Sequence, residues 1–272
     1  MIIKTLVENI SSELPGEFGL SLYFETGTHK FLFDTGASSL FADNAKKLGV
    51  DLQAVEFVIL SHGHHDHGGG LNTFLAMNKT AKVFLKKSAF GSFKSEEGTD
   101  MYEDLGLDPS LKDNPRMVFT SDYFELADGV TLFSGVKGTN FFPMGNQSLF
   151  KLEEGKYIPD DFLHEQNMVV NENGKYLLVS GCSHRGIVNI LQQFYVLFGR
   201  FPTHVIGGFH LYDHKTGKTE SDQTLKGISK YLLSTGALYY TCHCTGVESY
   251  HKLKDFMGER IEYLPCGRCL TI

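Results

Sequence analysis

Apolar and polar residues alternate along the first half of the chain in short stretches that are separated by glycine-rich turns. Alternation with a period of two predicts strands, whereas apolar residues that recur every three or four positions predict amphipathic helices. The first three strands predict an antiparallel meander. The stretch AVEFVILSH is nearly all apolar, which is typical of a strand covered on both faces. By these criteria we expect strands at 1–9, 19–27, 30–36, 54–62 and 81–87, and helices at 38–50 and 71–77.

The second half repeats a regular alternation of strand and helix patterns. Successive strand and helix units indicate an α/β protein in which helices cover a sheet. No linker rich in proline or serine divides the chain, so we expect one domain over residues 1–272. The expected strands are 175–181, 203–209, 237–242 and 260–266, and the expected helices are 186–199, 220–236 and 247–258.

Residues 91–116 interrupt this regularity. The segment is polar, rich in acidic residues and poorly periodic, which indicates a loop rather than core. We expect an insertion or a lid here, with a solvated surface excursion as the alternative.

Composition and charge narrow the classes of function. The chain has 272 residues, a formal net charge of −7 and no basic stripe of lysine and arginine, so we expect no nucleic-acid partner. No stretch of about 18 uninterrupted apolar residues occurs, so we expect no membrane span. The N-terminal segment lacks the pattern of a secretory signal. The five cysteines are an odd number and fit thiols in a reducing compartment better than a disulfide framework. We therefore expect a cytoplasmic protein that acts on a small molecule, with its oligomeric state left open.

A dense group of metal-binding residue types, HGHHDH, follows directly after the predicted buried strand. Alternate residues of an irregular loop can point the same way, so His62 and His64 can hold one ion while Asp66 and His67 face a second. Imidazole nitrogen with carboxylate oxygen suits zinc, iron or manganese better than calcium. The glycines Gly68–Gly70 predict unusual backbone angles and a sharp turn into a helix. A histidine-rich surface loop is the alternative interpretation.

The H-x-H-x-D-H pattern at residues 62–67, after VEFVILS and downstream of FLFDTG, resembles the signature of the metallo-β-lactamase superfamily. The resemblance implies a fold of the α/β class, the four-layer αββα sandwich, with the metal ions at one edge. It implies two divalent metal ions as cofactors, zinc first, with iron or manganese as alternatives. It usually implies hydrolysis by a metal-bound hydroxide.

Later segments resemble a narrower branch of that superfamily. SGCSHRGIVNI at 180–190, IGGFHL at 206–211 and CHCTG at 242–246 are similar to archaeal dihydropterin synthase-like proteins of the methanopterin pathway. This resemblance covers nearly the whole chain. The branch is named for an enzyme that joins a pterin diphosphate to an aryl ribose phosphate, but many of its bacterial members have no settled substrate, so the name alone does not transfer a reaction.

A two-metal site needs more ligands than the first motif supplies, and they should lie at the ends of later strands that reach the same sheet edge. His184, His210 and His243 each follow a predicted strand, and we expect His184 to bind metal. The superfamily commonly places its last ligand histidine on a late strand-to-helix turn. This favours His243 for the second ion and leaves His210 to contact a ligand or the substrate, but the choice between the two stays open.

Other side chains are interpreted from their positions. Asp34, in FLFDTG, resembles the buried aspartate of the superfamily that orients metal ligands without binding metal. Cys182 can bind zinc or be a small buried residue next to the ligands or the substrate, and we expect the latter. His164 stands where true β-lactamases have a ligand histidine, but the narrower branch often has an acid there, so we interpret it as a surface histidine. A small zinc site or a disulfide is an alternative to buried thiols for four late cysteines, Cys242, Cys244, Cys266 and Cys269.

Together these residues predict a hydrolase. Between two close metal ions a bridging water loses a proton near neutral pH, and the metals stabilise the charge that develops on the substrate oxygen. Asp66 is the expected catalytic residue, because it would hold the second ion and accept a hydrogen bond from the nucleophile. The expected substrate is a phosphoester or a related anionic small molecule. Phe141 and Phe142, in the glycine-rich segment 135–145, either stack on its ring or belong to an ordinary aromatic-rich loop, and both interpretations stay open.

Two other classes of function remain as alternatives. A transferase like the named enzyme of the branch would join a pterin diphosphate to an aryl ribose phosphate, and it would have to exclude water from its site. A non-catalytic protein would bind a metal or a small ligand without turnover, although the intact first motif argues against that interpretation.

Overall fold

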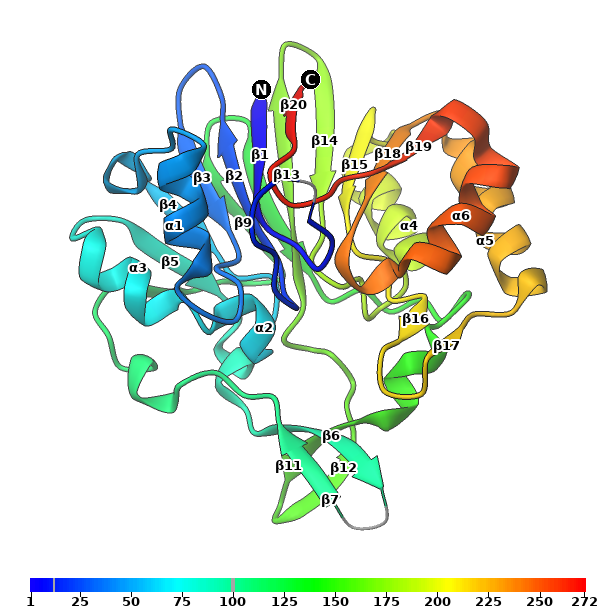
Figure 1. The fold of residues 1–272 in the computed structure, drawn as a ribbon, viewed down its shortest axis with the longest axis horizontal. Helices are drawn as coiled ribbons and strands as arrows, with labels where there is room; N and C mark the ends of the chain where they lie inside the picture. The colour runs from blue at the N-terminus through cyan, green and yellow to red at the C-terminus, as the bar shows by residue number, and fades with distance from the viewer. Residues whose placement is uncertain (12, 99–100) are drawn as a thin grey trace. The chain divides into compact units, whose positions relative to one another are not determined.

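The computed structural model describes residues 1–11, 13–98 and 101–272, and Figure 1 shows the arrangement of their helices and strands. The chain divides into two compact units, each built around one seven-stranded sheet. The single domain expected over residues 1–272 stays a prediction. The first unit contains Met1–Ser121, Phe150–Gln166 and Pro265–Ile272, and the second contains Asp122–Leu149 and Asn167–Leu264.

The sheet of the first unit has the strand order β20-β1-β2-β3-β4-β5-β8. Strands β1, β2 and β3 pair antiparallel, which confirms the predicted meander, whereas β3, β4, β5 and β8 run parallel. The segments after β3 and β4 therefore lie side by side, and Asp34 N donates a 2.9 Å hydrogen bond to Ile59 O. The strands are β1 (Ile2–Val7), β2 (Ser21–Glu25), β3 (Lys30–Phe33), β4 (Phe57–Ile59), β5 (Lys82–Leu85), β8 (Met117–Phe119) and β20 (Cys269–Thr271).

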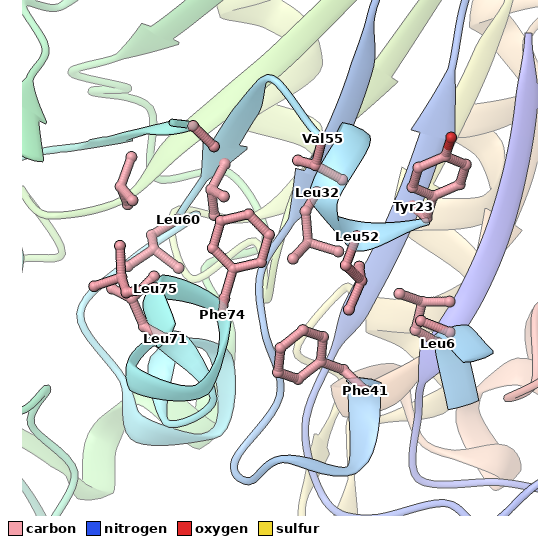
Figure 2. Packing of buried hydrophobic residues seen from close by; sticks show 14 of the residues in the cluster. Leu6, Tyr23, Leu32, Phe41, Leu52, Val55, Leu60, Leu71, Phe74 and Leu75 are labelled. Atoms are coloured by element: carbon pink, nitrogen blue, oxygen red, sulfur yellow. The ribbon is translucent and has the colours of Figure 1, made fainter. Parts of the chain in front are cut away.

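Helices of the first unit pack on this sheet through their apolar faces. Figure 2 shows Phe41 and Phe74, one from each long helix, beside Leu32 of β3 in a common hydrophobic cluster. Burial of each such side chain stabilises the fold by about 1.5–3 kcal/mol. Residues 58–60 are all fully buried, as predicted for a strand covered on both faces. The helices are α1 (Leu40–Lys47), the short α2 (His65–Gly68) and α3 (Leu71–Met77).

Residues 91–116 contain regular structure. Strands β6 (Phe93–Gly98) and β7 (Met101–Asp104) form an antiparallel hairpin. The hairpin belongs to a four-stranded sheet with the order β12-β11-β6-β7, where β11 is Leu149–Glu153 and β12 is Lys156–Pro159. Farther along, Leu107 and Leu111 are buried in the hydrophobic cluster of the first unit. Apolar side chains thus anchor this polar segment to the core, while its role as an insertion or lid stays a prediction.

The sheet of the second unit has the order β19-β18-β15-β14-β13-β10-β9. Strands β14, β15, β18 and β19 run parallel, and a helix connects each of them to the next, as the regular rhythm of the sequence predicted. The strands are β9 (Tyr123–Ala127), β10 (Val130–Ser134), β13 (Gln166–Glu172), β14 (Lys175–Val179), β15 (His204–Gly207), β18 (Leu238–Thr241) and β19 (Ile261–Tyr263), with a separate hairpin of β16 (Tyr212–Asp213) and β17 (Lys218–Thr219).

Local signals explain where the helices of the second unit begin and end. The Ser221 side chain accepts a hydrogen bond from Thr224 N at the start of α5, and Gly236 ends that helix at φ 76°, a left-handed angle that glycine adopts without strain. Apolar residues of all three helices pack in one cluster with the sheet. The helices are α4 (Ile187–Phe198), α5 (Asp222–Thr235) and α6 (Val247–Met257).

The parallel strands determine where functional groups can gather. In sheets of this kind, binding residues occupy the loops at the carboxyl ends of the strands. In the first unit that position after β4 holds residues 62–67, and in the second unit the segments after β14, β15 and β18 hold the other candidate ligands. Across the described part of the chain, every helix is too short or too polar to cross a membrane.

Candidate metal centre

The histidine motif forms the loop between β4 and α2. His62 and His67 are fully buried and His64 nearly so, whereas the Asp66 side chain is 18% exposed. Backbone hydrogen bonds hold the loop, because the carbonyl of Asp66 accepts from Leu20 N and the carbonyl of His67 accepts from Thr35 N. The loop is therefore fixed by segments that lie far from it in sequence.

The glycines Gly68–Gly70 are required for a different reason from the one the sequence indicated. Gly69 has φ −63° and Gly70 has φ −75°, which are ordinary helical angles, so the expectation of unusual backbone angles is wrong. A Cβ atom on Gly69 would lie 2.2 Å from the Ala37 carbonyl oxygen, and one on Gly70 would lie 2.3 Å from the Thr35 carbonyl oxygen. These positions exclude a side chain because two backbone segments pack closely there.

Asp34 organises the loop from beneath. It follows β3 at φ 60° and is fully buried. Its carboxylate accepts hydrogen bonds of 2.7 Å from Ser61 N, from Ser61 Oγ and from His67 Nδ1. Because a carboxylate only accepts, the His67 proton lies on Nδ1, which leaves the Nε2 lone pair available to a metal ion.

Ser61, which sequence reasoning missed, fixes the next histidine in the same way. Its hydroxyl hydrogen is committed to Asp34, so the 2.8 Å contact between Ser61 Oγ and His62 Nδ1 requires His62 to donate. The lone pair of His62 then lies on Nε2. That atom is 3.1 Å from His64 Nδ1, so a proton or a cation must lie between the two nitrogens.

This arrangement fits a metal ion. Two imidazole nitrogens bound tetrahedrally to one zinc ion are about 3.4 Å apart, given Zn–N distances of about 2.1 Å, and the observed separation of 3.1 Å is close to that value. Burial, together with the neighbouring His164, lowers the pKa of His64 to about 3. His64 is therefore neutral at physiological pH, which is the form that binds metal.

His164 is buried, with only 2% of its surface exposed, so its interpretation as a surface histidine is wrong. Its Nδ1 accepts a 3.0 Å hydrogen bond from Gly63 N, inside the histidine motif, and its Nε2 lies 2.9 Å from Asp160 Oδ2. Because a backbone N–H can only donate, the His164 proton lies on Nε2 and points to Asp160. The ligand atoms of His64, Asp160 and His164 all lie within 4.8 Å of one another.

Asp160 is a second acid that sequence reasoning missed. Burial would raise its pKa, but the hydrogen bond and charge of His164 and the N–H of Phe162 outweigh burial and hold the pKa below its ordinary value. The weak signal in the sequence was a carboxylate and an imidazole four residues apart, a spacing that many surface loops share.

Candidate ligands of the second unit come from three strand-end segments. His184 follows β14, His210 follows β15 and His243 follows β18. Ser183, His210 and His243 have φ of 56°, 51° and 51°, values that cost energy for residues other than glycine. Such strain concentrates at functional sites, and here it occurs beside or at each candidate ligand.

Potential donor atoms of the described residues gather in at least two groups in this unit. The ligand atoms of Cys182, His184 and His210 lie within 4.8 Å of one another, and so do those of Cys182, His243 and Cys244. Cys182 belongs to both groups and is buried. Cys244 was not among the ligands predicted from the sequence, because its CxC spacing with Cys242 is also typical of a separate small zinc site.

Hydrogen bonds distinguish the histidines of this unit. His184 Nδ1 lies 3.0 Å from Asn146 Oδ1, and because an amide oxygen accepts, the lone pair of His184 lies on Nε2. Both ring nitrogens of His210 are buried and lack a hydrogen-bond partner among the described residues. His210 is therefore as suitable for binding an ion as His243 is, and the choice between them stays open.

The Cys244 thiol has a perturbed environment in the second unit. Burial would raise the pKa of the Cys244 thiol, but the Cys182, His210 and His243 side chains hold it well below its usual range. No disulfide joins any of the five cysteines, all of which lie in the described part of the chain. The disulfide interpretation of the late cysteines is therefore wrong.

The two phenylalanines that are candidates for stacking on a substrate already have neighbours in the second unit. The Arg185 guanidinium lies over the Phe142 ring, 5.5 Å from its centroid. Phe141 lies against Gly227, where an added Cβ would be 2.6 Å from the ring. Both rings are partly exposed, and stacking on a ligand stays a prediction.

Comparisons with known proteins support the resemblance seen in the motifs. The family model described as the metallo-beta-lactamase superfamily matches residues 14–135. The crystal structure of Tm1679, described as a metal-dependent hydrolase of the beta-lactamase superfamily, is 31% identical, covers 100% of this chain and 99% of that one, and superposes with a TM-score of 0.84.

Two further comparisons extend this result. A curated protein of Methanocaldococcus jannaschii, named 7,8-dihydropterin-6-methyl-4-(beta-D-ribofuranosyl)-aminobenzene-5'-phosphate synthase, is 28% identical over 98% of this chain and 95% of the relative. The metallo-beta-lactamase fold protein YhfI from Bacillus subtilis is 12% identical over 99% of both chains, with a TM-score of 0.59, and shares the fold alone. The resemblance to the superfamily and to its methanopterin-pathway branch is confirmed.

Proposed function

Because this chain belongs to the metallo-β-lactamase superfamily, we propose that it is a metal-dependent hydrolase of a phosphoester or a related anionic small molecule. The observation that carries the proposal is the buried pair of nitrogens, His62 Nε2 and His64 Nδ1, 3.1 Å apart. Beside them, His67 is oriented by Asp34. Neighbouring side chains set the lone pairs of His62 and His67, and His64 is neutral, so the three imidazoles form a preorganised set of ligands.

Each unit supplies candidate metal ligands of its own. Nitrogen and carboxylate donors fit zinc first, with iron or manganese as alternatives. When bound, two divalent ions lower the pKa of a water and stabilise negative charge on a substrate oxygen. If His210 rather than His243 binds the second ion, His210 takes the place of His243 among the proposed ligands. The proposed ligands are His62, His64, Asp66, His67, His184 and His243.

The chain's own residues divide the remaining work. Asp34 and Ser61 orient His67 and His62 through hydrogen bonds of 2.7–2.8 Å. Asp66 is the one carboxylate of the motif and its side chain is 18% exposed, so it can accept a hydrogen bond from an attacking water. Cys182 lies beside His184 and His210, where it would contact the ligands or the substrate.

A second candidate function is that of a synthase. It is favoured by the similarity to the methanopterin-pathway synthase, which covers 98% of this chain. The same ligands would then serve a transfer reaction between a pterin diphosphate and an aryl ribose phosphate, and water would have to be excluded from the site. A protein that binds metal without turnover is the third alternative.

The test begins with protein purified without added metal. Bound metals are counted by mass spectrometry, and hydrolysis of bis-p-nitrophenyl phosphate is measured for the wild type, His64→Ala and His65→Ala. His65 is the matched control, because it belongs to the same loop but its side chain is exposed. Two metal ions per chain, with hydrolysis lost in His64→Ala and kept in His65→Ala, would support the hydrolase.

Other outcomes separate the alternatives. Bound metal without hydrolysis would overturn the hydrolase in favour of the synthase, which is then assayed with a pterin diphosphate and an aryl ribose phosphate. Bound metal with neither activity would leave the non-catalytic alternative. A protein that holds no metal would overturn the central claim.

A further inference from the structure

A pocket of about 320 Å³ lies entirely within the first unit. Its walls come from the 3-10 turn Lys87–Phe90, from the residues around the start of β6, and from the segment 161–164. Lys87, Lys112 and Lys151 line it, with Asp161 as the one lining carboxylate. The whole chain carries a formal net charge of −7, so this pocket has the opposite charge balance from the protein around it.

Two of the three lysines form no ion pair with any carboxylate that the structure describes. Lys151 Nζ is 2.7 Å from Asp161 Oδ2 and 3.1 Å from Glu153 Oε2, so its charge is already balanced. Among the residues that the structure describes, no carboxylate forms an ion pair with Lys87 or Lys112. Two ammonium groups that line the same pocket without an ion pair attract an oxyanion. Hydrogen bonds between ionised partners are about twice as strong as neutral ones.

The rest of the wall mixes polar residues, such as Ser88 and Ser92, with apolar side chains. Phe90 is partly buried, and Leu163 is 59% exposed although it lines a concave surface. A ligand with only a small inorganic anion would leave these side chains in contact with water. An oxyanion carried on a flat apolar group would cover them, and burial of apolar surface would add to the binding.

The pocket reaches the histidine motif through one side chain. His164 lines the pocket, and its Nδ1 accepts the hydrogen bond from Gly63 N within the motif. Its ring centroid is 5.3 Å from that of His64. Because all these residues belong to the first unit, a ligand in the pocket would lie one side chain away from the candidate metal ligands.

We propose that this pocket binds the phosphate group of an aryl phosphate, and that it anchors one end of the substrate beside the metal centre. The role of the pocket as a substrate site rests on the proposed function, whereas the binding of an aryl phosphate does not. A phosphate dianion matches two uncompensated lysines, whereas a carboxylate needs only one. Lys87 and Lys112 are the specificity-determining residues, and Phe90 and Leu163 contact the ring.

The experiment measures binding of phenyl phosphate by isothermal titration calorimetry to the wild type and to the double variant Lys87→Gln/Lys112→Gln. The double variant should bind about tenfold more weakly, because each removed charge-assisted contact contributes measurably to affinity. The matched control is Lys46→Gln/Lys47→Gln, two exposed lysines of α1 in the same unit, which should bind like the wild type. Benzoate should bind the wild type more weakly than phenyl phosphate does.

Two comparisons keep this proposal separate from the proposed function. His64→Ala should still bind phenyl phosphate, so binding that is lost in His64→Ala but kept in the lysine double variant would place the anion at the metal centre and overturn the pocket. If the wild type hydrolyses bis-p-nitrophenyl phosphate and the lysine variant binds phenyl phosphate normally, the pocket proposal fails and the hydrolase stands. If the lysine variant loses binding and the wild type has no hydrolytic activity, the pocket stands and the hydrolase fails.

Discussion

The two units present their candidate ligands in different ways. In the first unit the donors lie in one loop of six residues after β4, where hydrogen bonds to Asp34 and Ser61 set the tautomers of His67 and His62. In the second unit the donors are distributed over three segments, after β14, β15 and β18. The candidate ligands of the first unit therefore form a local motif, whereas those of the second unit gather only because parallel strands end at one edge of a sheet.

The difference extends to how each set is supported. The motif of the first unit rests on ordinary helical angles and close backbone packing at Gly69 and Gly70. The second set holds Ser183, His210 and His243 at positive φ, and the surrounding fold has to offset that strain. A contiguous motif can be recognised in the sequence because its donors lie within six residues, although Asp34, which supports it, is itself at φ 60°. A distributed set depends on the tertiary structure even for bringing its donors together.

The largest change is expected when the residue that supports the histidine motif, Asp34, is removed. Asp34→Ala leaves Ser61 N–H, Ser61 O–H and His67 Nδ1–H buried without their acceptor. We expect the free energy of unfolding to fall by about 3–5 kcal/mol, since each unsatisfied buried donor costs about 1–3 kcal/mol. Urea denaturation and metal analysis measure the effect.

The control for this change is Asp43→Ala, which removes an exposed carboxylate from α1 and should shift the unfolding free energy by less than about 0.5 kcal/mol. Equal stability of Asp34→Ala and Asp43→Ala would contradict the idea that the motif depends on Asp34.

A smaller change in metal binding is expected in the second unit, where His210 and His243 are both candidates for the second ion. We expect His243→Ala to lose one of two metal ions, and His210→Ala to keep both with metal affinity or activity reduced about 10–100-fold, as for groups that orient ligands. Metal counting by mass spectrometry distinguishes the two variants. Loss of an ion in His210→Ala but not in His243→Ala would reverse their roles.

A minor effect is expected for two thiols of the first unit, Cys266 and Cys269. Burial raises the pKa of Cys266 to about 11, so its reactive thiolate is scarce at pH 8 and increases only as pH rises toward that value. Cys269 is exposed. Iodoacetamide at pH 8 should modify Cys269 and spare Cys266, as read by peptide mass spectrometry of the folded protein.

Unfolding in urea provides the control for that experiment, because both thiols should then react. Rapid modification of Cys266 in the folded protein would show that its burial is not maintained in solution.

The helices, the strands and the family could be predicted from local patterns in the sequence. Strands and helices follow from apolar periods that neighbouring residues set, so the meander of β1 to β3 and the alternation from β14 to β19 could be predicted. The spacing of His62, His64, Asp66 and His67 carried the metal chemistry, because six consecutive residues have few ways to arrange four donors.

The groups that are distant in sequence but contact the histidine motif could be identified from the tertiary structure alone. His164 lies 101 residues from Gly63, to which it is hydrogen-bonded, and its polar sequence surroundings gave no sign of burial. Asp34 is 33 residues from His67, and its three hydrogen bonds arise because β3 and β4 are parallel neighbours. Contacts of this kind depend on the order of strands in a sheet, which is a property of the whole fold and not of any local pattern.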